Sequence, residues 1–255
     1  GAPCVESDGV RICGVPGPEG ASPGSSESLG LLEGPVQSAS PGAKRVRWYA
    51  EGVHHFAWST SPDYIYEEGR FEDVVVRVLY RPGDEESWGD GIALERTIQA
   101  MAWMDTVFGD FAYPQVTNLH RIEPGGTEFP MVIMDGSASL GLIVHEINHQ
   151  YAHAILGNNE WYEGWLDEGM SSFLENWFFE RRGGGRGLWL GSEAQIIDLE
   201  LTGDAAPVTY PAEDYATYGI YGAMVYTKGS LILRMLRDMA GEERMIDVLR
   251  AYYAR

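Results

Sequence analysis

Cysteine is scarce in this sequence of 255 residues, which contains only Cys4 and Cys13. Neither belongs to a C-x-x-C pair, so a zinc site built from cysteines is excluded. The two thiols can form one small disulfide loop if the protein is exported, or they can remain free. The chain begins with Gly-Ala-Pro, without an initiator Met or a visible signal peptide, so we expect it to be a processed or shortened chain.

Positive charge is also scarce, and long hydrophobic runs are missing. Lys and Arg together number 18 against 38 Asp and Glu, which gives a formal net charge of −20. We therefore expect no nucleic-acid partner, because such partners require a basic face. An acidic protein attracts cations, including the protonated amine of a peptide, although the charge serves solubility equally well. No apolar run approaches the ~20 residues that a transmembrane helix requires, so we expect no transmembrane segment.

Apolar residues are plentiful enough for a large core, since 44% of the residues are hydrophobic, with 8 Trp and 14 Tyr. They are unevenly distributed along the chain. Gly, Pro and Ser dominate residues 1–43, which we interpret as an irregular segment or the remnant of a preceding domain. Residues 44–255 are expected to form one domain.

Hydrophobic periodicity predicts strands first and mostly helices afterwards. Period-two patterns predict strands at residues 45–50, 73–80, 115–122 and 127–134. Helical spacing predicts helices at residues 90–108, 166–179, 192–201, 221–239 and 242–253, and one that begins near Ser137 or Ser139 and ends before Gly157. In the helix at 221–239, Leu231, Leu233, Met235 and Leu236 are expected to face the core. This order predicts an α+β fold, with a small mixed sheet followed by a mostly helical lobe.

The pattern that indicates chemistry is the H-E-x-x-H motif from His145 to His149. Two histidines four residues apart leave the same face of a helix one turn apart, so both can bind one ion. Glu146 points about 100° around the helix, where it can reach a metal-bound water. This arrangement is typical of a zinc hydrolase with a glutamate base, and we expect a single Zn²⁺ cofactor held between the sheet and the helical lobe.

A catalytic zinc usually takes a third protein ligand and keeps one position open. Glu168 is the candidate, because the 19 residues that separate it from His149 allow one helix to end and another to return. His153 is the rival, but three histidines on one helix approach the ion from one side only. We therefore interpret His153 as a supporting or surface histidine. His54 and His55 are adjacent and point to opposite sides of an extended chain, so we give them little weight as ligands.

These motifs resemble the gluzincin aminopeptidases of the aminopeptidase N type, with a thermolysin-like catalytic domain. The zinc motif is followed at the family's spacing by Trp-Leu-Asp-Glu-Gly at residues 165–169. Residues 125–129 stand where the family has Gly-x-Met-Glu-Asn, with Thr127 in place of Met and Phe129 in place of Asn. Residues 226–229 resemble its Tyr-x-Lys-Gly segment, and residues 56–59 resemble the entry into the bacterial catalytic domain. The resemblance covers residues 45–255 and assigns residues 44–255 as the catalytic domain.

The resemblance implies roles for individual residues. Zn²⁺ on His145, His149 and Glu168 activates water, Glu146 acts as general base, and Tyr226 stabilises the oxyanion. Glu128 holds the free α-amine of a peptide substrate. The remaining implied positions are Gly125, Gly126 and Tyr221 at the substrate and Glu175 behind a ligand histidine. As structural alternatives, Tyr226 can be a core aromatic, and Glu128 and Glu175 can be solvated carboxylates.

The resemblance thus implies a zinc metallopeptidase, and most directly an aminopeptidase with a peptide substrate. An endopeptidase with an open cleft keeps the same zinc chemistry and lacks the amine anchor. A peptide-binding module that holds metal without turnover is the alternative from another class. The flanking domains of the family are not recognisable, so flanking domains of a longer parent chain are expected.

Overall fold

The computed structural model describes residues 4–7, 10–13, 50–185 and 187–254, which belong to two compact units, Gly1–Gly52 and Val53–Arg255. In the first unit, strands β1 (Cys4–Ser7) and β2 (Val10–Cys13) form an antiparallel pair in which Cys4 lies opposite Cys13. The predicted boundary after residue 43 falls outside the described residues, and so does all but the last residue of the strand predicted at 45–50.

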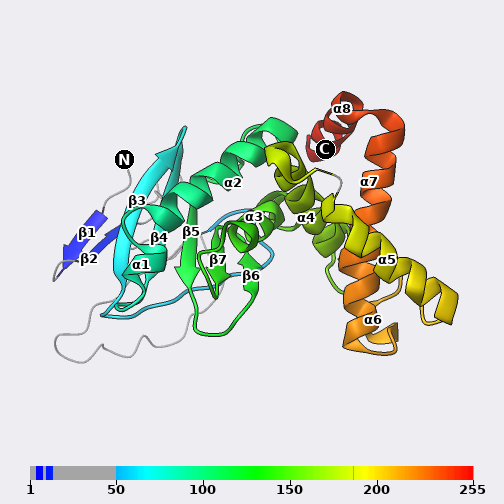
Figure 1. Ribbon diagram of the computed structural model, residues 1–255. Helices are drawn as coiled ribbons and strands as arrows, with labels where there is room; N and C mark the ends of the chain where they lie inside the picture. Colours follow the sequence, from blue (N-terminus) through cyan, green and yellow to red (C-terminus); the bar gives the residue numbers. More distant parts are fainter. Residues whose placement is uncertain (1–3, 8–9, 14–49, 186, 255) are drawn as a thin grey trace, which may run out of the picture. The chain divides into compact units, whose positions relative to one another are not determined.

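A five-stranded mixed sheet begins the second unit (Figure 1). Its strands are β3 (Ile65–Phe71), β4 (Val74–Tyr80), β5 (Gln115–His120), β6 (Gly126–Phe129) and β7 (Val132–Asp135). The order is β3-β4-β5-β7-β6, with parallel pairs in the centre and antiparallel pairs at both sides. Strand β6 is therefore an edge strand, and its free edge can pair with an added chain.

Two strand predictions need correction. Strand β3 was not predicted, because Glu67, Glu68 and Gly69 interrupt its hydrophobic pattern. Gly69 belongs there because helix α2 (Ile92–Phe108) packs closely, and a Cβ at this position would lie 3.2 Å from the side chain of Leu94. The single strand predicted at 127–134 is instead the hairpin of β6 and β7, since Pro130 lacks an N–H and Met131 adopts a φ of 64°.

Helices make up the rest of the unit and confirm the predicted α+β class. They are α1 (Glu85–Trp88), α2 (Ile92–Phe108), α3 (Leu140–His149), α4 (Gly164–Phe179), α5 (Gly187–Thr202), α6 (Tyr218–Gly222), α7 (Gly229–Ala240) and α8 (Glu242–Tyr253). Short π-helices follow α3, α4 and α6, namely η2 (Gln150–Ile155), η3 (Glu180–Gly184) and η5 (Ala223–Lys228), and a 3₁₀ turn, η4, spans Ala212–Asp214. No helix among the described residues has the length and apolar character needed to cross a membrane.

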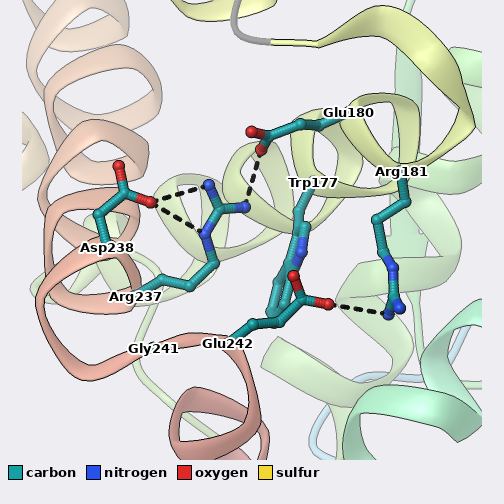
Figure 2. A pocket seen from close by; sticks show the side chains of 7 residues that line it. All are labelled: Trp177, Glu180, Arg181, Arg237, Asp238, Gly241 and Glu242. Carbon is teal, nitrogen blue, oxygen red and sulfur yellow. Dashed lines mark hydrogen bonds and ion pairs between the residues drawn. The ribbon is translucent and has the colours of Figure 1, made fainter.

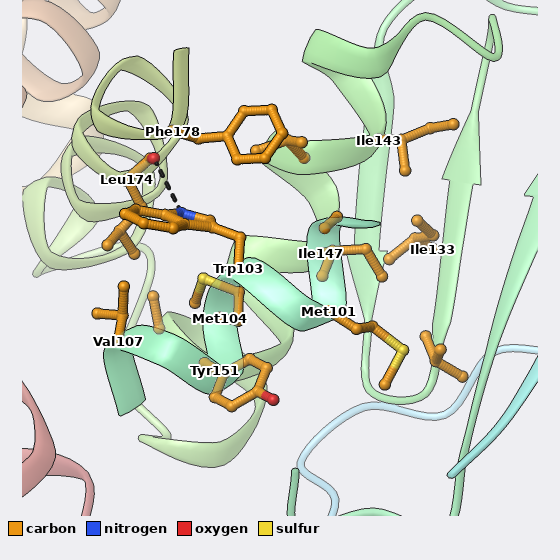
Figure 3. Packing of buried hydrophobic residues seen from close by; sticks show 14 of the residues in the cluster. Met101, Trp103, Met104, Val107, Ile133, Ile143, Ile147, Tyr151, Leu174 and Phe178 are labelled. Atoms are coloured by element: carbon orange, nitrogen blue, oxygen red, sulfur yellow. Dashed lines mark hydrogen bonds between the residues drawn. The ribbon is translucent and has the colours of Figure 1, made fainter. Parts of the chain in front are cut away.

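The hydrophobic core fixes α3 between α2 and α4 (Figure 3). Met101 and Met104 of α2 and Ile143 and Ile147 of α3 are at most 1% exposed. The indole N–H of Trp103 donates a 3.2 Å hydrogen bond to the carbonyl of Leu174 in α4. Burial of each such side chain contributes about 1.5–3 kcal/mol, so α3 has a rigid support on its apolar side.

The face of helix α7 that packs against the core differs from the predicted one. Met235 and Leu236 are 62% and 50% exposed, whereas Leu233 is buried as predicted. The inner face is taken by two arginines, whose guanidinium groups lie 5.0 Å (Arg234) and 5.2 Å (Arg237) from the ring centres of Trp189 and Trp177. The cation–π contacts and the apolar stems allow these arginines to be buried where the hydrophobic pattern places apolar residues.

Candidate metal and catalytic site

Helix α3 carries the H-E-x-x-H motif. The hydroxyl of Ser139 caps the helix by accepting a hydrogen bond from the Leu142 N–H at 3.4 Å, so one of the two predicted caps is used. Val144 and Ile147 are fully buried, and His145 and His149 leave the opposite side with their ring centres 4.9 Å apart. The apolar face therefore anchors the helix and leaves the two imidazoles free to converge.

The three predicted ligand atoms come together at one point. The Nε2 atoms of His145 and His149 are 3.2 Å apart, and they lie 3.2 Å and 3.1 Å from Oε2 of Glu168 on α4. A tetrahedral ion with ligand bonds of ~2.0–2.1 Å separates its ligand atoms by about 3.3 Å. The spacing, and the donor set of two imidazoles and one carboxylate, fit Zn²⁺.

Each imidazole is held from behind by a carboxylate. Nδ1 of His145 lies 3.2 Å from Oε2 of Glu175, the residue expected in this position. Nδ1 of His149 lies 2.5 Å from Oδ1 of Asp167, a buried carboxylate that the sequence reasoning missed. Such partners fix the ring orientation and direct Nε2 toward a metal. The signal for Asp167 was its place next to Glu168, where helical geometry turns its side chain to a different face.

In this cluster, the charges and hydrogen bonds of neighbouring residues shift the pKa values in the direction opposite to the effect of burial. Burial lowers the pKa of His145, but the hydrogen bonds that its ring donates to the carboxylates of Glu168 and Glu175 outweigh burial and raise the pKa to about 10. Burial also lowers the pKa of His149, and the charges of Asp167 and Glu168 raise it well above its usual value. The pKa of Glu168 falls below its usual range, because the two histidines outweigh its burial. Without metal, both imidazoles hold protons that a binding cation must displace.

Glu146 lies beside the ligand cluster in a position that depends on Gly126. Glu146 is only 4% exposed to solvent, and its Oε2 has no hydrogen-bond partner among the described residues. A Cβ at position 126 would lie 2.0 Å from Oε1 of Glu146, so only glycine leaves room for this carboxylate. Burial raises the pKa of Glu146 to about 7, which suits a group that exchanges a proton near neutral pH.

Tyr226 in η5 reaches the same cluster. Its hydroxyl donates a 2.5 Å hydrogen bond to Oε1 of Glu168, and its ring stacks on His145 with centres 6.1 Å apart and planes 5° apart. Burial and the neighbouring Glu168 charge raise the pKa of Tyr226, so it remains a neutral donor. The ring of Tyr221 lies 6.2 Å from that of Tyr226. Both tyrosines therefore face the site, as the resemblance implies.

A cavity of about 500 Å³ opens beside the cluster. It is lined by Glu128, Glu160, Trp161, Asp167, Glu168, Ala212, Tyr215, Thr217, Tyr218 and Tyr221. Its charged residues are all acidic, and its aromatic rings come from the loop before α4 and from the segment around α6. The structure brings Glu128 of β6 near Glu146 and His149, and burial raises the pKa of Glu128. Gly125 does not line this cavity; it adopts a φ of 85° in the turn before β6 and accepts a hydrogen bond from the Gly136 N–H.

A second cavity, of about 410 Å³, lies where α4, α7 and α8 meet (Figure 2). Its charged groups are paired with one another. Arg237 donates to Glu180 at 2.8 Å and to Asp238 at 3.1 Å, and Arg181 lies 3.1 Å from Glu242. These pairs support the packing of the helices.

Histidines that were given little weight also come together. His54 lies at a bend, so it and His55 do not point to opposite sides as an extended chain would require. The ring centres of His54 and His55 lie 4.5 Å and 6.1 Å from that of His153. His153 is buried, and its Nε2 lies 3.1 Å from Oε2 of Glu160. Sequence spacing could not reveal this group, because it depends on a loop that returns to the end of the metal helix.

Comparison with known proteins agrees with this site. Residues 133–255 match the family model described as the peptidase family M1 domain. The chain is 24% identical over 218 residues to "Aminopeptidase 2, mitochondrial" of Saccharomyces cerevisiae, covering 73% of this chain and 22% of that protein. It is 26% identical over 116 residues to aminopeptidase N of Escherichia coli, covering 43% of this chain and 13% of that protein. The chain thus spans less than a third of the length of these relatives.

Solved structures share the fold. An M1 zinc metallopeptidase of Deinococcus radiodurans, in a mutant bound to a Tyr-Ser-Ala substrate, matches with a TM-score of 0.64 and 18% identity. The match covers 75% of this chain and 44% of that chain. The matched family segment holds His145, Glu146, His149, Glu168 and Tyr226. Residues 133–255 of this chain are therefore similar to the peptidase family M1 domain, in agreement with the gluzincin resemblance.

Proposed function

We propose that this protein is a zinc-dependent metallopeptidase that removes residues from the free amino termini of peptides. The observation that carries the proposal is the convergence of His145, His149 and Glu168, with Glu146 on one side and Tyr226 on the other. The first three residues would hold the ion. Zn²⁺ in such a site polarises a carbonyl and lowers the pKa of a bound water to about 7.

The remaining steps belong to the side chains of the chain itself. Glu146 accepts a proton from the attacking water and delivers it to the leaving amine, which requires a carboxyl with a pKa near neutrality. Tyr226 is a neutral phenol that can turn from Glu168 to the developing oxyanion and donate a hydrogen bond to it. Asp167 and Glu175 hold His149 and His145 in place during the reaction.

Selectivity for a free amino terminus rests on the acidic cavity and on strand β6. Glu128 lies on this edge strand, close to Glu146 and His149. A peptide that extends the sheet along β6 would place its first residue beside the Glu128 carboxylate, which would bind the ammonium group. The aminopeptidase names of the relatives support the same reading. Since those relatives are much longer, the proposal includes flanking domains of a longer parent chain that complete the cleft.

The test compares one peptide with a free and with an acetylated amino terminus. We expect the wild type to cleave only the free peptide, and Glu128→Gln to raise KM for it about 10–100-fold, the loss of one charged hydrogen bond. Glu163→Gln is the matched control, because Glu163 is exposed in the loop before α4 and does not line the cavity. Equal cleavage of the acetylated peptide would indicate an endopeptidase. Zinc binding without turnover of either peptide would indicate a binding module.

A further inference from the structure

A second group of potential metal ligands lies next to the zinc ligands. Ligand atoms of His54, His55 and His153 lie within 4.8 Å of one another, and so do those of His153, Glu160 and Asp167. Nε2 of His153 lies 3.1 Å from Oε2 of Glu160. Nε2 of His55 lies 4.0 Å from the other oxygen, Oε1, of Glu160. Three imidazoles therefore lie together, and the carboxylate of Glu160 approaches two of them.

The π-helix η2 separates this group from the zinc ligands. In an unbroken α-helix, His153 would lie one turn above His149 on the same face. The π-helix widens the turn that begins at Gln150, and His153 points instead toward His54 and Glu160. The two sets of ligands therefore lie side by side without sharing a histidine.

The donors select the class of ion. Imidazole nitrogens suit zinc and other late transition ions, whereas Mg²⁺ and Ca²⁺ prefer sites made of oxygen ligands. The 3.1 Å separation of His153 and Glu160 is close to the ~3.3 Å between ligand atoms of a tetrahedral zinc site, whereas the 4.0 Å separation of His55 and Glu160 must shorten when an ion binds. His54, His55 and Glu160 are exposed, so their side chains can close on an ion without any change in the core.

We propose that His54, His55, His153 and Glu160 form a second binding site for Zn²⁺ or a similar transition ion, at the rim of the substrate cavity. Glu160 lines that cavity, so the second site opens onto the path of the substrate. The buried His153 anchors the site, and its three partners are more exposed. We therefore expect this site to bind zinc more weakly than the site of His145, His149 and Glu168.

Asp167 connects the two sites. Its Oδ1 lies 2.5 Å from Nδ1 of His149, and its Oδ2 lies 3.6 Å from Nδ1 of His153. An ion on Nε2 of His153 would require the proton on Nδ1, which then faces Asp167 as it does in His149. One buried carboxylate would thus orient one histidine of each site. Asp167→Asn is expected to weaken zinc binding at both sites, by about 10–100-fold each.

The experiment counts zinc ions per full-length chain by equilibrium dialysis and calorimetry after the metal has been stripped, with no substrate present. We expect two ions per wild-type chain, one tight and one weaker. The double variant His54→Ala/His55→Ala should bind one ion with the tight affinity unchanged. Glu160→Gln should weaken only the second ion, by about 10–100-fold, whereas the neighbouring Glu163→Gln should bind as the wild type does.

Binding of a single zinc by the wild type, up to millimolar zinc, would overturn the proposal. So would a second zinc that persists in the double histidine variant with its affinity unchanged. Co²⁺ provides an independent readout, because its visible absorption should show two components in the wild type and one in the double variant. These measurements need no turnover, so their outcome is separate from that of the proposed peptidase activity.

Discussion

The hydroxyl of Tyr226 and the carboxylate of Glu168 are joined by a hydrogen bond of 2.5 Å. The other oxygen of that carboxylate faces both ligand histidines, at 3.2 Å from His145 and 3.1 Å from His149. One glutamate therefore serves the metal position with one oxygen and holds the tyrosine with the other. The phenol therefore lies directly beside the cluster of His145, His149 and Glu168.

This relationship predicts the effect of Tyr226→Phe. The change removes one hydroxyl and leaves the ring stacked on His145, so zinc content and fold should not change. If Tyr226 stabilises the transition state, kcat should fall about 10²–10³-fold with little change in KM. Steady-state kinetics with metal analysis measures both. Tyr162→Phe is the control, since Tyr162 is exposed and does not line the cavity, and an equal loss in that variant would contradict the role given to Tyr226.

The proton-accepting role of Glu146 predicts a pH profile. Burial raises the pKa of its carboxyl to about 7, and the group accepts a proton only when ionised. As pH falls through about 7, kcat/KM should therefore decrease, approaching tenfold per pH unit, and it should level off above. Zn²⁺ brings the same double positive charge as the two imidazole protons that it displaces, so we expect the midpoint to stay near this value. Glu146→Gln should retain zinc, lose about 10²–10⁴-fold in rate and lose this acidic limb.

The contact between Gly126 and Glu146 predicts that Gly126→Ala inactivates the site while the protein remains folded. The new Cβ would occupy space within 2.0 Å of Oε1 of Glu146, so the carboxylate must leave its position. We expect kcat to fall by at least about tenfold, because misplacement of a general base by about 1 Å has that scale of effect. Thermal unfolding should show a well-folded protein. Gly191→Ala, a helical position with open space around it, should keep full activity, and full activity in Gly126→Ala would refute the argument.

Metal removal should be coupled to protons. The pKa of His145 is about 10 and that of His149 is well above its usual value, so both rings are protonated at pH 7 in the metal-free protein. Zinc must displace these protons, and its affinity should therefore increase as pH rises. Calorimetry in two buffers with different ionisation enthalpies should report about two protons released per tight zinc at pH 7. Release of none would show that the rings are neutral before zinc binds.

Local patterns predicted most helices of this domain. The predicted helix at 90–108 corresponds to α2, and that at 166–179 to α4, because each has a continuous apolar stripe and a glycine or cap near its end. Strand β3 and the β6–β7 hairpin were less accessible. Strand β3 pairs with the next strand, β4, and β6 with the next strand, β7. Their period-two patterns are obscured by the charged residues Glu67 and Glu68 and by the turn at Pro130.

The places where prediction failed are those where tertiary contacts replace the usual hydrophobic pattern. Met235 and Leu236 were expected inside α7, but Arg234 and Arg237 stack on buried tryptophans and occupy that face. Asp167 was not predicted because its role depends on a 2.5 Å contact with His149, which belongs to another helix. Neither the buried arginines of α7 nor the contact of Asp167 with His149 can be read from the hydrophobic pattern of its own helix.

The sequence by itself determined that His145 and His149 share one face of helix α3, because a spacing of four on a helix is a local geometric fact, and it predicted from this that they bind zinc. Only the tertiary structure decided that Glu168 closes the ligand set, that Gly126 leaves room for Glu146, and that His54 and His55 meet His153 and Glu160. The physical reason is that these relationships join segments from different elements. Their distances are set by how the sheet, the loops and the helices pack, and no local pattern encodes that packing.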